Sequence, residues 1–135
     1  MANALLQRTA WTAPAYLSAA GLLVYSVQKA YYATQGRLGI PGGDHVPAAA
    51  YEQLGHVALR QWTLASLGLL GAALAVSTVF ARRRLLLIPL WVALLPMLAG
   101  APYLIAAGSA GLWRGAAVTL LWLAMTLSYQ VRSRR

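Results

Sequence analysis

The sequence predicts an all-α integral membrane protein in which four transmembrane helices form an antiparallel bundle. The 135-residue chain is 60% hydrophobic and 10% charged, whereas a soluble domain is about 45–50% apolar and about 25% charged. Its mean hydropathy is +0.61, and short basic or Gly/Pro-containing breaks separate four long apolar stretches. This length accommodates one domain, 1–135, with about four spans and no large soluble part.

The first span is predicted at 12–33, with Pro14 in the first turn, where a helix tolerates proline. It is too long for a cleaved signal peptide, so we expect a retained helix. A loop with the helix breakers Pro41, Gly42 and Gly43 follows it. The sequence therefore predicts a long Gly/Pro-containing connection between the first two spans.

From Pro47 the residues are compatible with one continuous helix to about Ala81, with Gly55 as a point of bending. At 1.5 Å per residue such a helix is about 50 Å long and exceeds the hydrocarbon core of about 30 Å. We therefore expect the second span at 61–81, and an extracytoplasmic loop and helix extension at 34–60.

The third and fourth spans are predicted at 85–107 and 112–131, after the basic turn 82–84 and a glycine-containing connection. Seven cations then lie on the side of the chain termini, against a net charge of +2 on the other side. The positive-inside rule places both termini in the cytoplasm and the chain in the inner (plasma) membrane. The high net charge is thus interpreted as topology, and no nucleic-acid partner is expected.

Several classes of protein are disfavoured by residue types. Absence of cysteine excludes disulfide exchange, thiolate metal sites and cysteine nucleophiles. The predicted spans contain no Asp, Glu or His. A proton relay through the membrane therefore has no obvious proton carrier, and a bis-histidine haem has no histidine ligands within the bundle. No glycine loop for a nucleotide is present.

Small residues spaced four apart predict close helix packing in lipid. They occur as Gly68 with Ala72, Gly71 with Ala75, and the set Ala107, Gly111, Gly115 and Thr119. Packing within one bundle is favoured over a homo-oligomer seam. Interfacial anchoring is predicted for Trp11, Trp62, Trp113, Tyr31, Tyr32, Tyr51 and Tyr129. Core packing is favoured over a ligand pocket for Trp91, Trp122, Tyr16 and Tyr25.

Both acidic residues and both histidines of the chain fall within thirteen positions, 44–56. On the predicted helix, the four-residue spacing places Glu52, His56 and Arg60 in a row on one face outside the bilayer. Lys29 and Gln28, near the outer end of the first span, lie at a depth that could meet this row. The candidate site consists of Glu52 and His56 as catalytic residues, and Lys29, Arg60, Gln28, Asp44 and His45 as substrate-binding residues.

Three interpretations of this cluster remain open. Glu52 and His56 could bind a divalent metal with Asp44 or His45. They could instead act as general acid or base on a hydrophobic substrate. The third interpretation is a structural ion network. The sequence identifies no cofactor and no particular metal.

The layout as a whole resembles the DoxX-like membrane proteins. The resemblance is architectural: Lys29 closes the first span, Glu52 opens a long second helix, and the basic turn 82–84 precedes the third span. It implies an accessory subunit of a membrane redox assembly.

The first functional hypothesis is a noncatalytic subunit or partner of a larger inner-membrane assembly, because the chain is small and carries close-packing faces. Its expected partners are membrane lipid, other membrane subunits or further copies of the chain. The alternatives are a membrane enzyme for a lipid-like or isoprenoid-like substrate, and an oligomeric pore or small-solute transporter.

Overall fold

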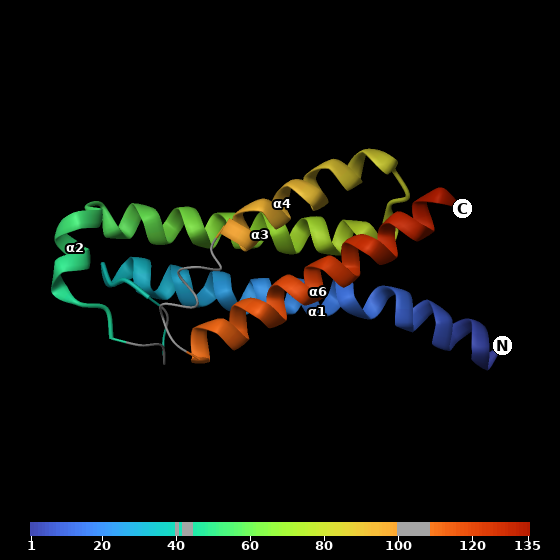
Figure 1. The fold of residues 1–135 in the computed structure, drawn as a ribbon, viewed down its shortest axis with the longest axis horizontal. Helices are drawn as coiled ribbons and strands as arrows, with labels where there is room; N and C mark the ends of the chain where they lie inside the picture. Colours follow the sequence, from blue (N-terminus) through green and yellow to red (C-terminus); the bar gives the residue numbers. More distant parts are fainter. Residues whose placement is uncertain (40, 42–44, 100–108) are drawn as a thin grey trace.

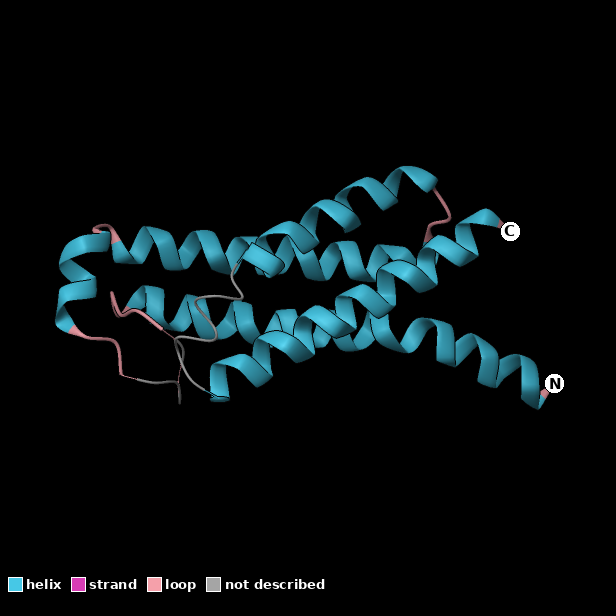
Figure 2. Cartoon of the chain, viewed as in Figure 1, coloured by secondary structure: helices cyan, strands magenta, loops and turns pink. Residues whose placement is uncertain are grey.

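The structure, a computed structural model, describes residues 1–39, 41, 45–99 and 109–135, and all regular elements in these ranges are helical (Figure 2). The predicted all-α class is therefore confirmed. In chain order the elements are α1 (Ala2–Thr34), α2 (Ala48–Leu54), α3 (Val57–Phe80), the 3₁₀ turn η1 (Arg84–Leu86), α4 (Leu87–Ala99) and α6 (Ser109–Arg134).

The long helices α1, α3, α4 and α6 alternate in direction, so both chain termini lie at one end and α2 lies at the other (Figure 1). The most extensive packing is between α1 and α3, and α6 packs against both α1 and α4. We call the end with α2 the loop end and the end with N and C the terminal end.

Helix α1 is longer than the predicted first span, with 33 residues that begin at Ala2. Its first ten residues are rich in Ala, Leu, Gln and Arg, which favour helix. Pro14 lies inside α1, where it removes one backbone hydrogen bond without ending the helix. The helix is about 50 Å long, so it exceeds the thickness of a hydrocarbon core.

The continuous helix expected from Pro47 to Ala81 is interrupted, and the interruption begins at Gly55, the expected point of bending. The chain breaks between α2 and α3 at Gly55, with φ 48° and ψ 165°, and at His56, with φ 45° and ψ 44°. The Gly55 conformation is one that glycine adopts and residues with a Cβ avoid. Histidine is among the residue types found more often in the left-handed region. Helix α3 therefore begins anew at Val57.

The contact between α1 and α3 is built from small side chains. A Cβ at Gly68 would clash with the side chain of Ser26 and would lie 3.3 Å from the backbone oxygen of Leu22. The neighbouring Ala72 and Ala75 are buried as well. The prediction that Gly68 and Ala72 pack within the bundle is confirmed, whereas Ala107 of the other predicted face lies outside the described residues.

The large side chains of the core come from α6 and α4. Trp122, Met125 and Tyr129 of α6 are each 1% exposed and cluster with the buried Leu90 and Leu94 of α4. The indole Nε1 of Trp122 donates to the Leu90 carbonyl at 2.9 Å. Core packing of Trp122 is confirmed, whereas the same prediction was wrong for Trp91 and Tyr16, whose side chains are 41% and 49% exposed.

Tyr129 was wrongly predicted to be an interfacial anchor, because its ring is buried in the core. Its hydroxyl donates to the Arg83 carbonyl at 2.8 Å. An aromatic residue near a helix end can satisfy its polar group on a neighbouring loop instead of on water or headgroups.

Candidate functional site at the loop end

Three polar side chains hold the segment that follows α1. Lys29 Nζ donates to the Gly39 carbonyl at 3.1 Å. Gln61 Nε2 donates to the same carbonyl at 3.1 Å and to the Arg37 carbonyl at 2.6 Å. The hydroxyl of Tyr51 accepts from the Leu38 backbone N–H at 3.0 Å. We call Lys29, Tyr51 and Gln61 the loop clasp.

The loop clasp joins three helices, because Lys29 belongs to α1, Tyr51 to α2 and Gln61 to α3. Backbone groups in an irregular segment need partners when they are removed from water. The clasp supplies these partners from side chains. Two donors converge on the carbonyl of Gly39, a residue with φ 90°. These hydrogen bonds fix the loop to the three helices, which is a structural role.

Aromatic rings line the same end of the bundle. The Lys29 ammonium lies 5.6 Å from the centre of the Tyr25 ring, and the Arg37 guanidinium lies 5.0 Å from the centre of the Tyr32 ring. Both distances fall within the range of cation–π attraction. These rings therefore help to hold the two cations near the end of α1.

Gln61 is the residue of this site that sequence reasoning missed. From the sequence, Gln61 was placed only at the start of the second span and was given no role, yet its side chain is buried, with 1% exposed. The signal was its spacing, since Gln61 is four residues before Ala65 and seven before Gly68, on the face of α3 that packs inward. A polar residue in register with buried small residues indicates an internal partner.

The predicted row of Glu52, His56 and Arg60 is divided between two helices. Glu52 lies in α2, His56 forms the left-handed junction, and Arg60 lies in the first turn of α3; all three are exposed. The four-residue spacing would give one face only in an unbroken helix. The row therefore does not exist as predicted, and Lys29 binds a loop carbonyl.

The other predicted residues are dispersed or undescribed. Gln28 is half-buried on α1 and His45 is exposed, while Asp44 lies outside the described residues. Within the described ranges, no group of three or more His, Asp or Glu residues could hold a metal ion. Catalytic roles for Glu52 and His56, and binding roles for the others, stay predictions.

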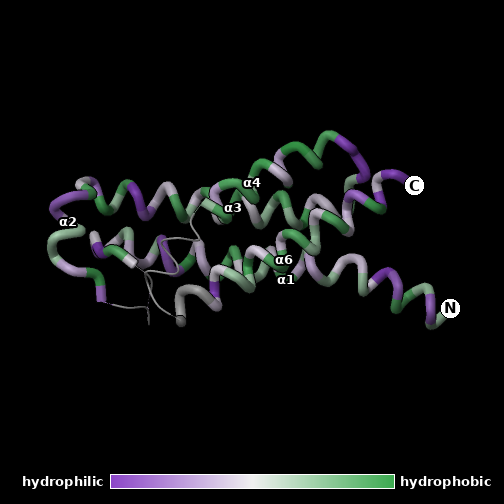
Figure 3. Tube along the Cα trace, in the orientation of Figure 1, coloured by the Kyte–Doolittle hydropathy of each residue, from purple (hydrophilic) through white to green (hydrophobic). Residues whose placement is uncertain are grey.

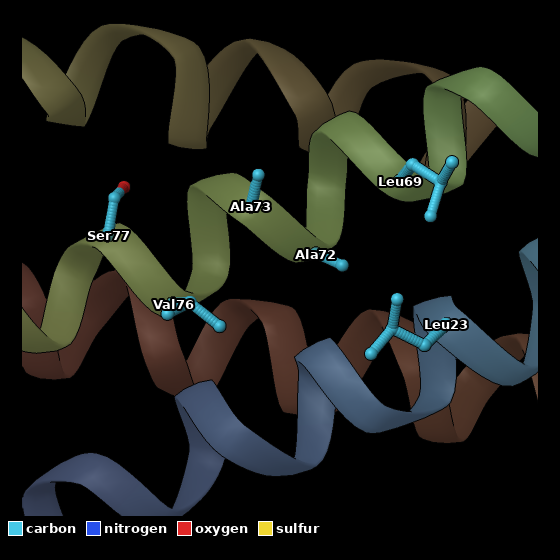
Figure 4. A pocket seen from close by; sticks show the side chains of 6 residues that line it. All are labelled: Leu23, Leu69, Ala72, Ala73, Val76 and Ser77. Atoms are coloured by element: carbon cyan, nitrogen blue, oxygen red, sulfur yellow. The ribbon is translucent and has the colours of Figure 1, made fainter.

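An apolar groove of about 490 Å³ runs between α1 and α3, farther along the bundle (Figure 4). Leu23 contributes from α1, and Leu69, Ala72, Ala73, Val76 and Ser77 contribute from α3. Along α3, the small side chains of Ala72 and Ala73 lie between the larger Leu69 and Val76 (Figure 4). The groove can take an apolar segment but offers few polar contacts for a soluble ligand.

Comparisons of this chain with protein-family models, curated proteins and solved structures gave no match. The resemblance to the DoxX-like proteins is therefore one of layout.

Proposed function

We propose that this chain is an integral membrane protein whose helices α1, α3, α4 and α6 cross the bilayer, with both termini in the cytoplasm. The observation that carries the proposal is an inverted distribution of side chains. The faces between α1 and α3 bury mainly Ala, Gly, Ser and Thr. Leucine, valine and tryptophan side chains are exposed along every long helix. Soluble proteins bury such residues, whereas membrane bundles pack through small ones.

Helix α3 provides the clearest single element for this proposal. Among the described residues it is the one helix long and apolar enough to cross a membrane, with a mean hydropathy of 1.9 in its most apolar window. Only 28% of that window is buried inside the protein. The helix 84–99 is apolar but shorter. An apolar surface of this extent is stable when lipid covers it.

The distribution of polar residues supports the orientation. Hydrophilic segments gather at the two ends of the molecule, and apolar segments occupy the middle (Figure 3). The terminal end holds the start of α1, which carries Arg8, and the last turn of α6, which carries Arg132 and Arg134 (Figure 1). The basic segment 82–84, between α3 and α4, lies at the same end. Because cytoplasmic segments are enriched in Lys and Arg, this end is proposed to face the cytoplasm.

Single-cysteine labelling tests the topology, because the natural chain has no cysteine. We expect a membrane-impermeant maleimide to label Gln53→Cys from the extracytoplasmic side of sealed vesicles or spheroplasts. Asn3→Cys and Arg134→Cys should react only after the membrane is opened. All three positions are exposed in the protein, so accessibility reports the side of the membrane.

The topology would be contradicted if all three cysteines were labelled equally in intact cells. The same result in sealed vesicles of one orientation, right-side-out or inside-out, would also contradict it. Alkaline carbonate extraction of the same samples supplies the control for membrane integration. Release of the wild-type chain by carbonate would contradict a transmembrane protein altogether.

Within the membrane, we propose that the chain acts as a noncatalytic subunit of a larger assembly. The groove between α1 and α3 supports this role, since it lies on the apolar exterior and small side chains let a neighbouring helix approach. Its proposed occupant is an apolar transmembrane helix of another subunit. The polar side chains Lys29 and Gln61 at the loop end already bind the chain's own backbone, so the groove is the better candidate for a partner.

A tryptophan placed in the groove tests this role. We expect Ala73→Trp to reduce stoichiometric co-purification of the partner from native membranes about tenfold, equivalent to about 1.4 kcal/mol. Leu67→Trp, at another exposed position of α3, is the matched control and should leave recovery unchanged. The subunit role would be refuted by a chain that stays monomeric and recovers no stoichiometric partner after mild solubilisation.

A further inference from the structure

A second pocket lies at the terminal end, among α1, the segment after α3, and the end of α6. Its volume is about 220 Å³, and it is lined by Trp11, Arg82, Val131, Arg132 and Arg135. Three of these five residues carry a guanidinium group. We call it the arginine pocket.

Two hydrogen bonds position the pocket. Tyr129 donates from its hydroxyl to the Arg83 carbonyl at 2.8 Å, and Arg84 Nε donates to the Ser133 carbonyl at 3.2 Å. Both bonds join the basic segment after α3 to the last turns of α6. By joining these two segments, the bonds keep Arg82 and Arg132 at the same pocket, against the repulsion between their positive charges.

The guanidinium of Arg132 is incompletely satisfied. Its Nε and Nη2 atoms are buried and have no hydrogen-bond partner within the described part of the chain. It lies 5.8 Å from the centre of the Tyr129 ring. Burial lowers the pKa of Arg132, and the positive charge of Arg82 lowers it further. Arginine nevertheless stays charged in proteins, so a half-buried guanidinium with two unpartnered buried nitrogens favours an external anion.

The chain itself has few anions to supply. Its acidic side chains are Asp44 and Glu52. Glu52 lies in α2, at the opposite end of the bundle from the arginine pocket (Figure 1). Two or three guanidinium groups around one small pocket match the charge and the several acceptor oxygens of a phosphate group.

We propose that the arginine pocket binds the phosphate-bearing headgroup of an anionic phospholipid. This assignment rests on the proposed membrane topology, which places the pocket at headgroup level on the cytoplasmic side. Basic pockets between transmembrane helices on this side bind such headgroups. Trp11 contributes an aromatic ring suited to the interface. Val131 and Leu127, four residues apart and exposed on α6, provide an apolar path for an acyl chain.

The test uses the full chain purified in a neutral detergent and measures its thermal unfolding with added lipid. Phosphatidylglycerol should raise the Tm at concentrations at which phosphatidylcholine and inorganic phosphate have little effect. The double substitution Arg82→Gln with Arg132→Gln should weaken the apparent affinity for phosphatidylglycerol about 30-fold, on the basis of two lost arginine contacts. Without lipid this variant should unfold at the same or a higher temperature, because it removes two neighbouring like charges and the two unpartnered buried nitrogens of Arg132.

Arg8→Gln with Arg134→Gln is the matched control, since it removes two exposed cations that do not line the pocket. It should retain most of the lipid response. Equal loss in both double variants would overturn the proposal, because only general surface charge would then be at work. If the first double variant fails to fold, the exposed Arg135→Gln replaces it, and an unchanged affinity would again overturn the site.

Inorganic phosphate distinguishes the two sources of the anion. Stabilisation by phosphate alone, equal to that by phosphatidylglycerol and lost in the pocket variant, would overturn the headgroup assignment in favour of a soluble phosphate compound. The topology is judged separately by cysteine labelling. A failure of the membrane proposal is therefore distinguishable from a failure of this pocket.

Discussion

Replacing Trp122 with alanine is expected to lower the free energy of unfolding by about 3–5 kcal/mol. The indole is 1% exposed and packs in the core shared by α6, α4 and α3. Its removal would leave a large cavity and would withdraw the donor from the Leu90 carbonyl. The measurement is reversible unfolding in mixed micelles, followed by far-UV circular dichroism.

Two variants separate the causes of this loss. Trp113→Ala is the matched control on the same helix, with a ring that is 75% exposed, and it should change stability by about 0.5 kcal/mol or less. Trp122→Phe keeps most of the volume but lacks the N–H, so its cost should be intermediate. Similar losses for Trp113→Ala and Trp122→Ala would mean that Trp122 is not part of a packed core.

Replacing Gly68 with leucine is expected to cost about 3 kcal/mol, because it forces α1 and α3 apart. Even a Cβ at this position would clash with Ser26 and crowd the Leu22 backbone. A backbone neighbour cannot move aside as a flexible side chain can. Equilibrium unfolding under the same conditions measures the loss.

Gly21→Leu is the matched control for this substitution. A Cβ at Gly21 would meet nothing within 4 Å, and leucine favours helix more than glycine does, so stability should stay the same or rise. A double-mutant cycle with Gly68→Ala and Ser26→Gly should show positive coupling, because the second change removes the clashing side chain. Additive effects would contradict close contact at this point.

The sequence was sufficient for the helical class and for the small-residue contact between α1 and α3. Long apolar stretches and the spacing of Gly68 and Ala72 carry that information directly. For the other helices, the sequence does not show which face packs inward and which faces outward. Apolar residues surround each helix, so the hydrophobic periodicity is weak. Tyr129 illustrates the difficulty, since its position suggested an interface and its ring lies in the core.

The candidate site was less predictable than the fold. Four-residue spacing indicates a shared face only if the helix continues, and the local conformation at Gly55 and His56 ends it. Gln61 and Lys29 meet at Gly39 through tertiary contacts that span 22 and 10 residues of chain. The arginines at 82, 132 and 135 were interpreted as topology signals, because their convergence on one pocket depends on how α6 packs.

The loop clasp also has a consequence for the order of assembly during synthesis. Every residue that it joins is already made once α3 has been translated, and the Gly68 contact is complete at the same stage. The N-terminal hairpin of α1 and α3 can therefore close, with its loop carbonyls satisfied, before α4 and α6 leave the ribosome. Under the proposed membrane topology, the later helices then dock on a preformed template, as expected when membrane helices insert first and associate afterwards.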